Sequence, residues 1–227
     1  MRAPVYFSGV KAYALSTAAL ALLLYAVALQ AAKTEDLLTL RTLLEVVAPL
    51  PLVLISAGLI QADPSLPAVA AKPTRLELVM VARWTLAITL TLPAPLAAHL
   101  VLAWQAPELS INALTWLAPS VFLGGLALAG AAAAATWHAG IGVAAAYWAA
   151  AILMLPVLEA ACAPYIPGAC GVAIWSSAYG LLAPGGSGWS INRALLLVTG
   201  SLLAVGAGLL YRNTERQLRS TSHEVAA

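Results

Sequence analysis

Six long apolar stretches constrain this chain more than any other feature. A helix needs about 20 apolar residues to cross the hydrocarbon core of a bilayer. Because the stretches are continuously apolar rather than alternating, they predict helices and not membrane β-strands. We therefore expect an all-α, polytopic membrane protein with one transmembrane domain over residues 1–227 and six transmembrane helices. The expected spans are 12–32, 43–61, 84–104, 117–137, 141–158 and 194–211.

The charge content excludes a soluble globular domain. Charged residues make up 9% of the chain and hydrophobic residues 62%, with a mean hydropathy of +0.91. A soluble domain is about 25% charged, so this surface must be covered by lipid. The net charge of +2 is too small to indicate a nucleic-acid partner. Two cysteines are too few for a zinc site, which needs about four ligands, and no metal is expected.

Basic residues predict the orientation, because Lys and Arg are enriched on the cytoplasmic side. With both termini cytoplasmic, eight of the eleven basic residues lie inside and three outside. The inside set is Arg2, Lys11, Lys72, Arg75, Arg83, Arg212, Arg216 and Arg219, and the outside set is Lys33, Arg41 and Arg193. The expected location is the cytoplasmic (inner) membrane.

Segment 62–83 is the longest predicted cytoplasmic connection. Thr74 follows Pro73 and precedes Glu77 by three residues, which is the spacing of a capping box, so a helix is predicted to begin here and run into the third span. Its apolar positions recur at helical steps. They are Leu76, Val79 and Met80, followed by Arg83. This stripe is expected to face a partner protein or the bundle; alternatively it lies on the inner leaflet, with Lys72 and Arg75 near anionic headgroups.

Two connections complete the layout. A tight turn at His138–Gly140 is expected between the fourth and fifth spans. The external segment 159–193 contains a moderately apolar run, 172–183, that is too short to span the bilayer. This run is expected to be a short helix that lies in the outer interface or dips inward.

Glu45 is the one carboxylate clearly inside a predicted span. Intramembrane acids usually mark functional sites. The alternative is that Glu45 lies close to the span boundary and pairs with Arg41, four residues earlier, at the outer surface.

Prolines and histidines give further candidates for a transport pathway. Two Pro-x-Pro motifs interrupt the second and third spans, where they either bend the helices for packing or line a pathway. His99 near the outer end of its span and His138 at the inner end are about 20 Å apart in depth at 1.5 Å per residue, so they cannot both ligate one haem. The pathway candidates are Glu45, Pro49, Pro51, Pro93, Pro95 and His99.

Small residues recur every four positions in two spans, which allows close helix contact. They are Gly200, Ala204 and Gly208 in the sixth span, and Gly125 with Ala129 and Gly130 with Ala134 in the fourth. The sequence has no G-x-x-x-x-G-K-[ST] phosphate loop. It also has no nucleophile–base motif, so we do not expect an enzyme.

Two stretches resemble the permease subunits of type-2 ATP-binding-cassette (ABC) exporters. The first is residues 52–63 followed by 72–83, which is similar to the family's second span, acidic residue, coupling helix and third span. The second runs from Ile191-Asn-Arg193 to Tyr211-Arg-Asn-Thr-Glu-Arg216, which looks like the closing span and its basic cytoplasmic end.

The resemblance implies a function in export. The chain would form the substrate pathway with a second permease, identical or homologous, and would dock a separate ATPase subunit that carries the ATP and Mg. No cofactor is expected on this chain. The docking residues implied are Lys72, Pro73, Thr74, Arg75, Leu76, Glu77, Val79, Met80 and His138. The alternatives are a membrane anchor or electron-transfer subunit of a respiratory complex and an ion-coupled carrier.

Cys162 and Cys170 are predicted to form a disulfide. Both lie in the predicted external segment, on the oxidising side, and the residues between them include two prolines and a glycine that let the chain turn back. Closing such a short loop stabilises by about 2–3 kcal/mol in the entropic treatment. The alternative is two free, buried thiols. Alkylation of both thiols without prior reduction, detected by mass spectrometry, would refute the bridge.

Overall fold

The computed structural model describes residues 26, 30, 42–59, 75–105, 112–153, 157, 176–179 and 188–212. Every regular element in these ranges is helical, as the apolar pattern predicted. In chain order they are η2 (Leu43–Val47), α3 (Leu50–Gly58), α5 (Leu76–Thr91), α6 (Pro93–Gln105), α7 (Leu114–Ala134), α8 (Trp137–Leu153) and α11 (Trp189–Tyr211).

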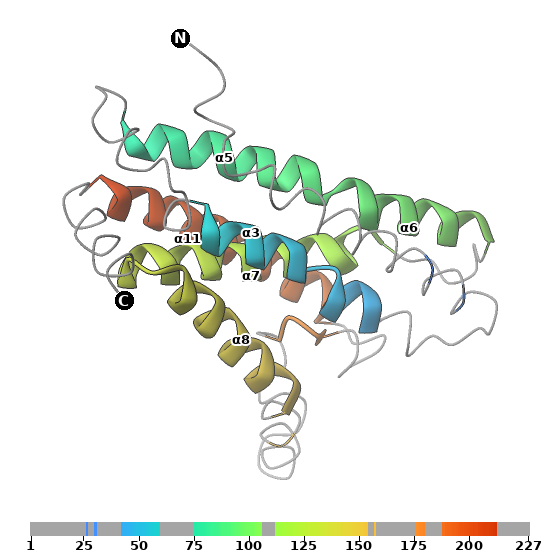
Figure 1. Cartoon of the computed structure of the whole chain (residues 1–227). Coiled ribbons are helices and arrows are strands. Elements are labelled where there is room, and N and C mark those ends of the chain that lie inside the picture. The colour runs from blue at the N-terminus through green and yellow to red at the C-terminus, as the bar shows by residue number, and fades with distance from the viewer. Residues whose placement is uncertain are drawn as a thin grey trace.

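Helix α7 is at the centre of the bundle. It packs against α11, α8, α3 and η2, while α5 packs against α11 and α3. Figure 1 shows α5 and α6 as one long rod along one side and α8 diverging from the other helices toward its C-terminal end. The start of α5 and the end of α11 lie at the same end of the bundle. With the predicted orientation this is the cytoplasmic end, and we call it the inner end.

Three helices are long and apolar enough to cross a membrane. They are Leu76–Leu100, Leu114–Ala134 and Trp189–Tyr211. Leu43–Gly58 and Trp137–Leu153 are shorter apolar helices, and the predicted span 12–32 lies almost entirely outside the described residues. Large apolar side chains are exposed along α5 and α11, including Leu78, Val81, Val198, Leu202 and Val205. Such faces are unfavourable in water and favourable in lipid.

A helix begins inside segment 62–83 and runs into the third span, as predicted. Helix α5 starts at Leu76, and α6 continues it from Pro93 to Gln105. Its N-cap is Arg75, which makes no side-chain capping bond. Thr74, the predicted cap, lies outside the described residues. Backbone bonds from Leu92 to Ile88 (2.9 Å) and from Leu96 to Leu92 (3.1 Å) carry the chain past Pro93 and Pro95.

The second span contains a π-helical turn before its prolines. The N–H of Ala48 donates to the carbonyl of Leu43 at 2.8 Å, five residues back. Pro49 and Pro51 have no N–H, so they cannot make the α-helical bonds to the carbonyls four residues earlier. The wider turn η2 forms immediately before them, and π-turns are frequent at functional sites. Glu45 is at the middle of this turn and is buried.

The turn between α7 and α8 is formed by residues 135 and 136, before the predicted position at 138–140. Ala135 has φ 56°, in the left-handed region that ends a helix. The hydroxyl of Thr136 accepts the N–H of Ala139 at 3.2 Å and so caps α8. The expected turn at 138–140 is therefore wrong: His138 lies in the first turn of α8, exposed, with its ring 3.9 Å from that of Trp137.

Glycines set the spacing between α7 and its neighbours. A Cβ at Gly125 would lie 2.3 Å from the carbonyl oxygen of Gly200, and one at Gly200 would lie 2.6 Å from the Cα of Phe122. A Cβ at Gly140 would lie 2.4 Å from the carbonyl oxygen of Ala127. The predicted small face of the sixth span is buried at Gly200, Ala204 and Gly208, so this prediction is confirmed.

Replacing Gly200 by alanine should destabilise the bundle because the new methyl group would overlap the backbone of α7. Overpacking of this kind costs about 1–3 kcal/mol. Gly206 on the same helix is the matched control, since a Cβ there meets nothing within 4 Å. Thermal unfolding in detergent should show a lower Tm for Gly200→Ala and an unchanged or higher Tm for Gly206→Ala. Equal Tm values for the two variants would contradict the close contact.

Candidate functional site

A buried ion pair joins the second span to the last one. Arg193 Nη2 donates to Glu45 Oε1, and the two side chains are 0% and 1% exposed. The residues are 148 positions apart in the sequence. We use the name Glu45–Arg193 cluster for Glu45, Arg193 and the residues that contact Arg193, which are described next. A buried pair of this kind is strongly destabilising when one partner is removed, because the other charge is then uncompensated.

Arg193 ends the predicted external segment, and Arg41 is the predicted alternative partner of Glu45. The prediction for Arg193 is wrong, because α11 begins at Trp189 and Arg193 is its fifth residue, buried and bound to Glu45. Arg41 lies outside the described residues.

Four residues of the predicted external segment, 176–179, are packed into the bundle beside Arg193. All four are buried. Asn192 Nδ2 donates to the carbonyl of Ser176 at 2.9 Å, and Arg193 Nη1 donates to the carbonyl of Ser177 at 3.5 Å. The prediction that the run 172–183 dips inward therefore holds for the part that is described.

Aromatic side chains complete the cluster. The Arg193 guanidinium carbon lies 5.4 Å from the ring centroid of Trp189, within cation–π range. The Tyr147 hydroxyl is hydrogen-bonded to the backbone of Ser177, which ties α8 to the same segment. Three parts of the chain thus meet at one arginine, η2, segment 176–179 and α11, and α8 joins them through Ser177.

Three side-chain atoms in and beside the cluster are buried and make no hydrogen bond. They are Arg193 Nε, Ser177 Oγ and Asn192 Oδ1, while Asn192 bonds through its Nδ2. A buried polar atom without a partner costs about 1–3 kcal/mol, so each such atom calls for an explanation. Further atoms of this kind on neighbouring helices are Trp116 Nε1, Trp148 Nε1 and His99 Nδ1.

Some of the predicted pathway residues lie on helices that pack against each other. Ala98 of α6 packs with Leu44 and Ala48 of the second span and with Trp116 of α7, so the two proline-bearing spans lie against each other. Pro49, Pro51 and Pro95 are buried, Pro93 is exposed, and His99 is half-buried. His99 belongs to α6 and His138 to the start of α8, and Figure 1 shows α6 and the start of α8 at opposite ends of the bundle. In the part of the chain that is described, no group of three or more His, Cys, Asp or Glu side chains is placed to hold a metal ion.

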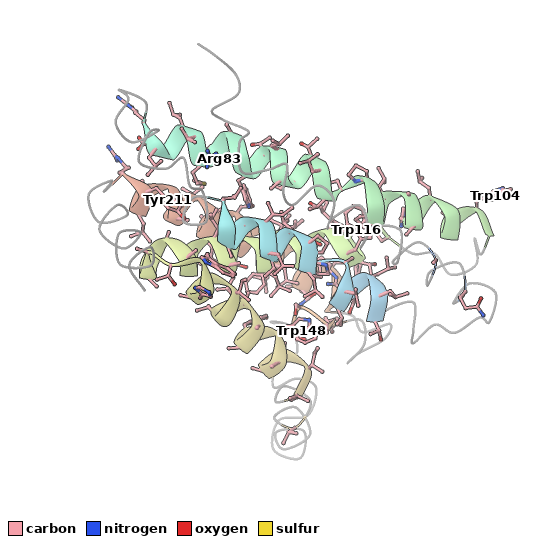
Figure 2. All side chains as sticks on the ribbon, in the orientation of Figure 1. Arg83, Trp104, Trp116, Trp148 and Tyr211 are labelled. Atoms are coloured by element: carbon pink, nitrogen blue, oxygen red, sulfur yellow. The ribbon has the colours of Figure 1, made fainter. Side chains whose placement is uncertain are left out.

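A second set of polar contacts is located at the inner end. Arg83 is buried, and its Nη1 donates to the carbonyl of Leu59, the C-cap of α3, at 2.8 Å. A cation at this position is favoured by the helix dipole. Glu77 of α5 lies 4.0 Å from Arg212 at the end of α11. Figure 2 shows Arg83 and Tyr211 at this end, with Trp116 and Trp104 toward the other end.

The predicted apolar stripe of the coupling segment faces this chain's own core. Leu76, Val79 and Met80 are buried in one cluster with Leu128, Ala204, Ala207 and Tyr211. Of the three interpretations, partner, bundle and inner leaflet, the bundle is the one observed. The helical spacing was correct, but a stripe cannot reveal which surface buries it. Arg75 and His138 are exposed, and Glu77 is partly exposed. Lys72, Pro73 and Thr74, like Cys162 and Cys170, lie outside the described residues.

Sequence reasoning missed most of the Glu45–Arg193 cluster. Ser176, Ser177, Trp189 and Tyr147 were not candidates, and Asn192 entered only through the family resemblance. The available signal was the polar pair Asn192-Arg193 directly before a long apolar run. Searches against protein-family models, curated proteins and solved structures found no match for this chain.

Removing one charge of the buried pair should destabilise the protein more than removing both. Glu45→Met or Arg193→Met leaves the other charge buried, at a cost of about 3–5 kcal/mol. The double variant Glu45→Met/Arg193→Met removes both charges, so its loss should be well below the sum of the two single losses. Unfolding of the three variants in detergent measures the difference. Losses that simply add would show that the pair is not coupled.

Proposed function

We propose that this chain is the membrane-spanning permease subunit of an ATP-driven ABC exporter. It forms the substrate pathway together with a second permease and docks a separate ATPase, which binds ATP and Mg. The chain itself carries no catalytic group in this proposal. It resides in the cytoplasmic membrane as a multi-pass protein.

One observation carries the proposal: the two stretches that resemble the exporter family meet at the inner end. The start of α5 and the end of α11 pack together through Leu76, Val79, Met80 and Tyr211. The contact between Glu77 and Arg212 joins the same two stretches at the surface. Residues 52–59, from the first stretch, are tied to α5 by the bond from Arg83 to the carbonyl of Leu59.

This arrangement supports transmission of motion from a cytoplasmic partner. Helix α5 begins at Leu76, after its exposed N-cap Arg75, and continues through α6, so a displacement at Arg75 would move a rod that crosses the bundle. Because Leu76, Val79 and Met80 are occupied by internal packing, the ATPase would contact the exposed residues around them. The exposed candidates at this end are Arg75, His138 and Arg212.

The buried Glu45 keeps an ion-coupled carrier as the second candidate. Carriers of this class use buried carboxylates to bind the coupling ion. In this structure Glu45 is buried and paired with a buried arginine. The two candidates differ in their energy source, since a carrier works without any ATPase.

The docking proposal predicts that Arg75→Gln weakens binding of the ATPase several-fold. The full chain is purified from its native membrane, and co-purified ATPase is measured as vanadate-sensitive ATP hydrolysis. Asn112→Asp is the matched control, because it changes the net charge equally, is exposed, and lies at the other end of the bundle beside the start of α7. It should leave the ATPase bound.

Two outcomes would contradict the proposal. Absence of any ATPase from the wild-type preparation, with transport abolished by an uncoupler, would favour the ion-coupled carrier. Equal loss of ATPase from Arg75→Gln and Asn112→Asp would show that the docking surface is not specific to the inner end.

A further inference from the structure

The face of α11 that points away from the core carries a regular row of exposed residues. They are Ile191, Ala194, Val198, Ser201 and Val205, which follow one another at steps of three, four, three and four residues. We call this row the α11 seam. Ile191, Val198 and Val205 are 56%, 57% and 64% exposed. These steps are the a and d spacing by which two helices pack along their length, and the small Ala194 and Ser201 would let two membrane helices approach closely.

Ser201 favours a protein neighbour over lipid. It lies near the middle of a helix that is long and apolar enough to cross a membrane, and it makes no hydrogen bond to any residue that the structure describes. Other helical hydroxyls donate to the carbonyl four residues earlier on their own helix. They are those of Thr85, Thr89, Thr91, Ser120 and Thr199. Lipid tails have no acceptor for the Ser201 hydroxyl, whereas a serine on a neighbouring helix has one.

The charges at the inner end of the seam are self-complementary. Arg212, seven residues after Val205, is the next seam position, because the backbone of this C-cap stays helical. Arg212 Nε lies 4.0 Å from Glu77 Oε1, and the two side chains are 66% and 25% exposed, so neither charge is enclosed by this contact. In a pair of copies that meet along the seam, Arg212 of each copy would lie close to Glu77 of the other. A contact between two identical surfaces requires such self-complementary charges.

The membrane restricts how two copies can meet. Each copy crosses the bilayer in the same orientation, so the same helix of two copies runs parallel and the two-fold axis between them lies along the membrane normal. This axis places Ser201 of one copy beside Ser201 of the other. A hydroxyl is both a donor and an acceptor, so each serine can satisfy the other.

We propose that a second copy of this chain packs on the α11 seam, with the two α11 helices parallel and the two Ser201 hydroxyls bonded across the two-fold axis. This inference rests on the proposed function, which requires a second permease, and it makes that permease an identical chain. Helix α5 contributes Glu77 to the contact at the inner end. The exposed apolar side chains of α6, such as Leu100, face lipid in this arrangement.

Cysteine cross-linking of the full chain in its native membrane tests the seam. Val198→Cys should give an oxidised dimer at several times the level of the wild-type chain, whose two native cysteines set the background. Leu100→Cys on α6 is the matched control, because Leu100 is exposed to nearly the same extent, 59% against 57%, and lies on a different helix. It should stay at the wild-type level. Equal cross-linking of the two variants, or none at Val198→Cys, would overturn the proposal.

Ser201→Ala tests the hydrogen bond across the axis. It removes the hydroxyl without adding bulk, so the chain should fold with an unchanged monomer structure while the dimer dissociates about threefold to tenfold more readily. The dissociation constant is measured on the purified full chain in detergent, from the dimer fraction at decreasing protein-to-detergent ratios. Thr89→Ala is the matched control, since Thr89 is exposed and its hydroxyl already donates to the carbonyl of Thr85 at 2.8 Å. It should dimerise as wild type does.

Two results in detergent would also contradict the inference. They are a wild-type chain that stays monomeric at every ratio, and equal dissociation constants for Ser201→Ala and Thr89→Ala. Neither measurement involves the ATPase, so the two proposals fail separately. Loss of the α11 contact leaves the exporter proposal to be judged by co-purification of the ATPase, and absence of the ATPase leaves the dimer in place.

Discussion

The cost of burying charge in an apolar bundle dictates the arrangement of the end opposite the inner end. Arg193 is fully buried, so its positive charge has to meet a negative charge and hydrogen-bond acceptors inside the protein. Glu45 supplies the charge, and the carbonyl of Ser177 supplies an acceptor. Each of these groups comes from a different segment, so satisfying one arginine fixes the relative positions of η2, segment 176–179 and α11.

The backbone conformation near Glu45 and Arg193 brings these two buried charges together. The prolines at 49 and 51 remove two helical donors, and the π-turn before them presents Glu45 to the interior. In the partner segment, α11 starts at Trp189, early enough for Asn192 and Arg193 to be part of the helix. Between the two ends of the bundle, Gly125 and Gly200 let the backbones of α7 and α11 come into direct contact. A side chain at either position would overlap the backbone of the other helix.

The comparison between sequence and structure shows where pattern reasoning succeeds. The apolar stretches gave the helical class and the approximate location of each described helix, because length and hydropathy are local properties. The four-residue spacing of Gly200, Ala204 and Gly208 correctly identified a buried face. The spacing of Leu76, Val79 and Met80 correctly indicated one face of a helix, yet that face packs on α11 instead of a partner. Periodicity shows that a face is buried and leaves its partner undetermined.

The sequence by itself determined that this chain is helical and suited to lipid, since 9% charged residues cannot cover a water-exposed surface. It also marked Glu45 as unusual, because a carboxylate in an apolar run is costly. Only the tertiary structure decided that its partner is Arg193, 148 residues away, and that Ser176 and Ser177 lie beside them. The physical reason is that the pairing of a buried charge depends on which helices meet, and that is set by packing between segments distant in sequence.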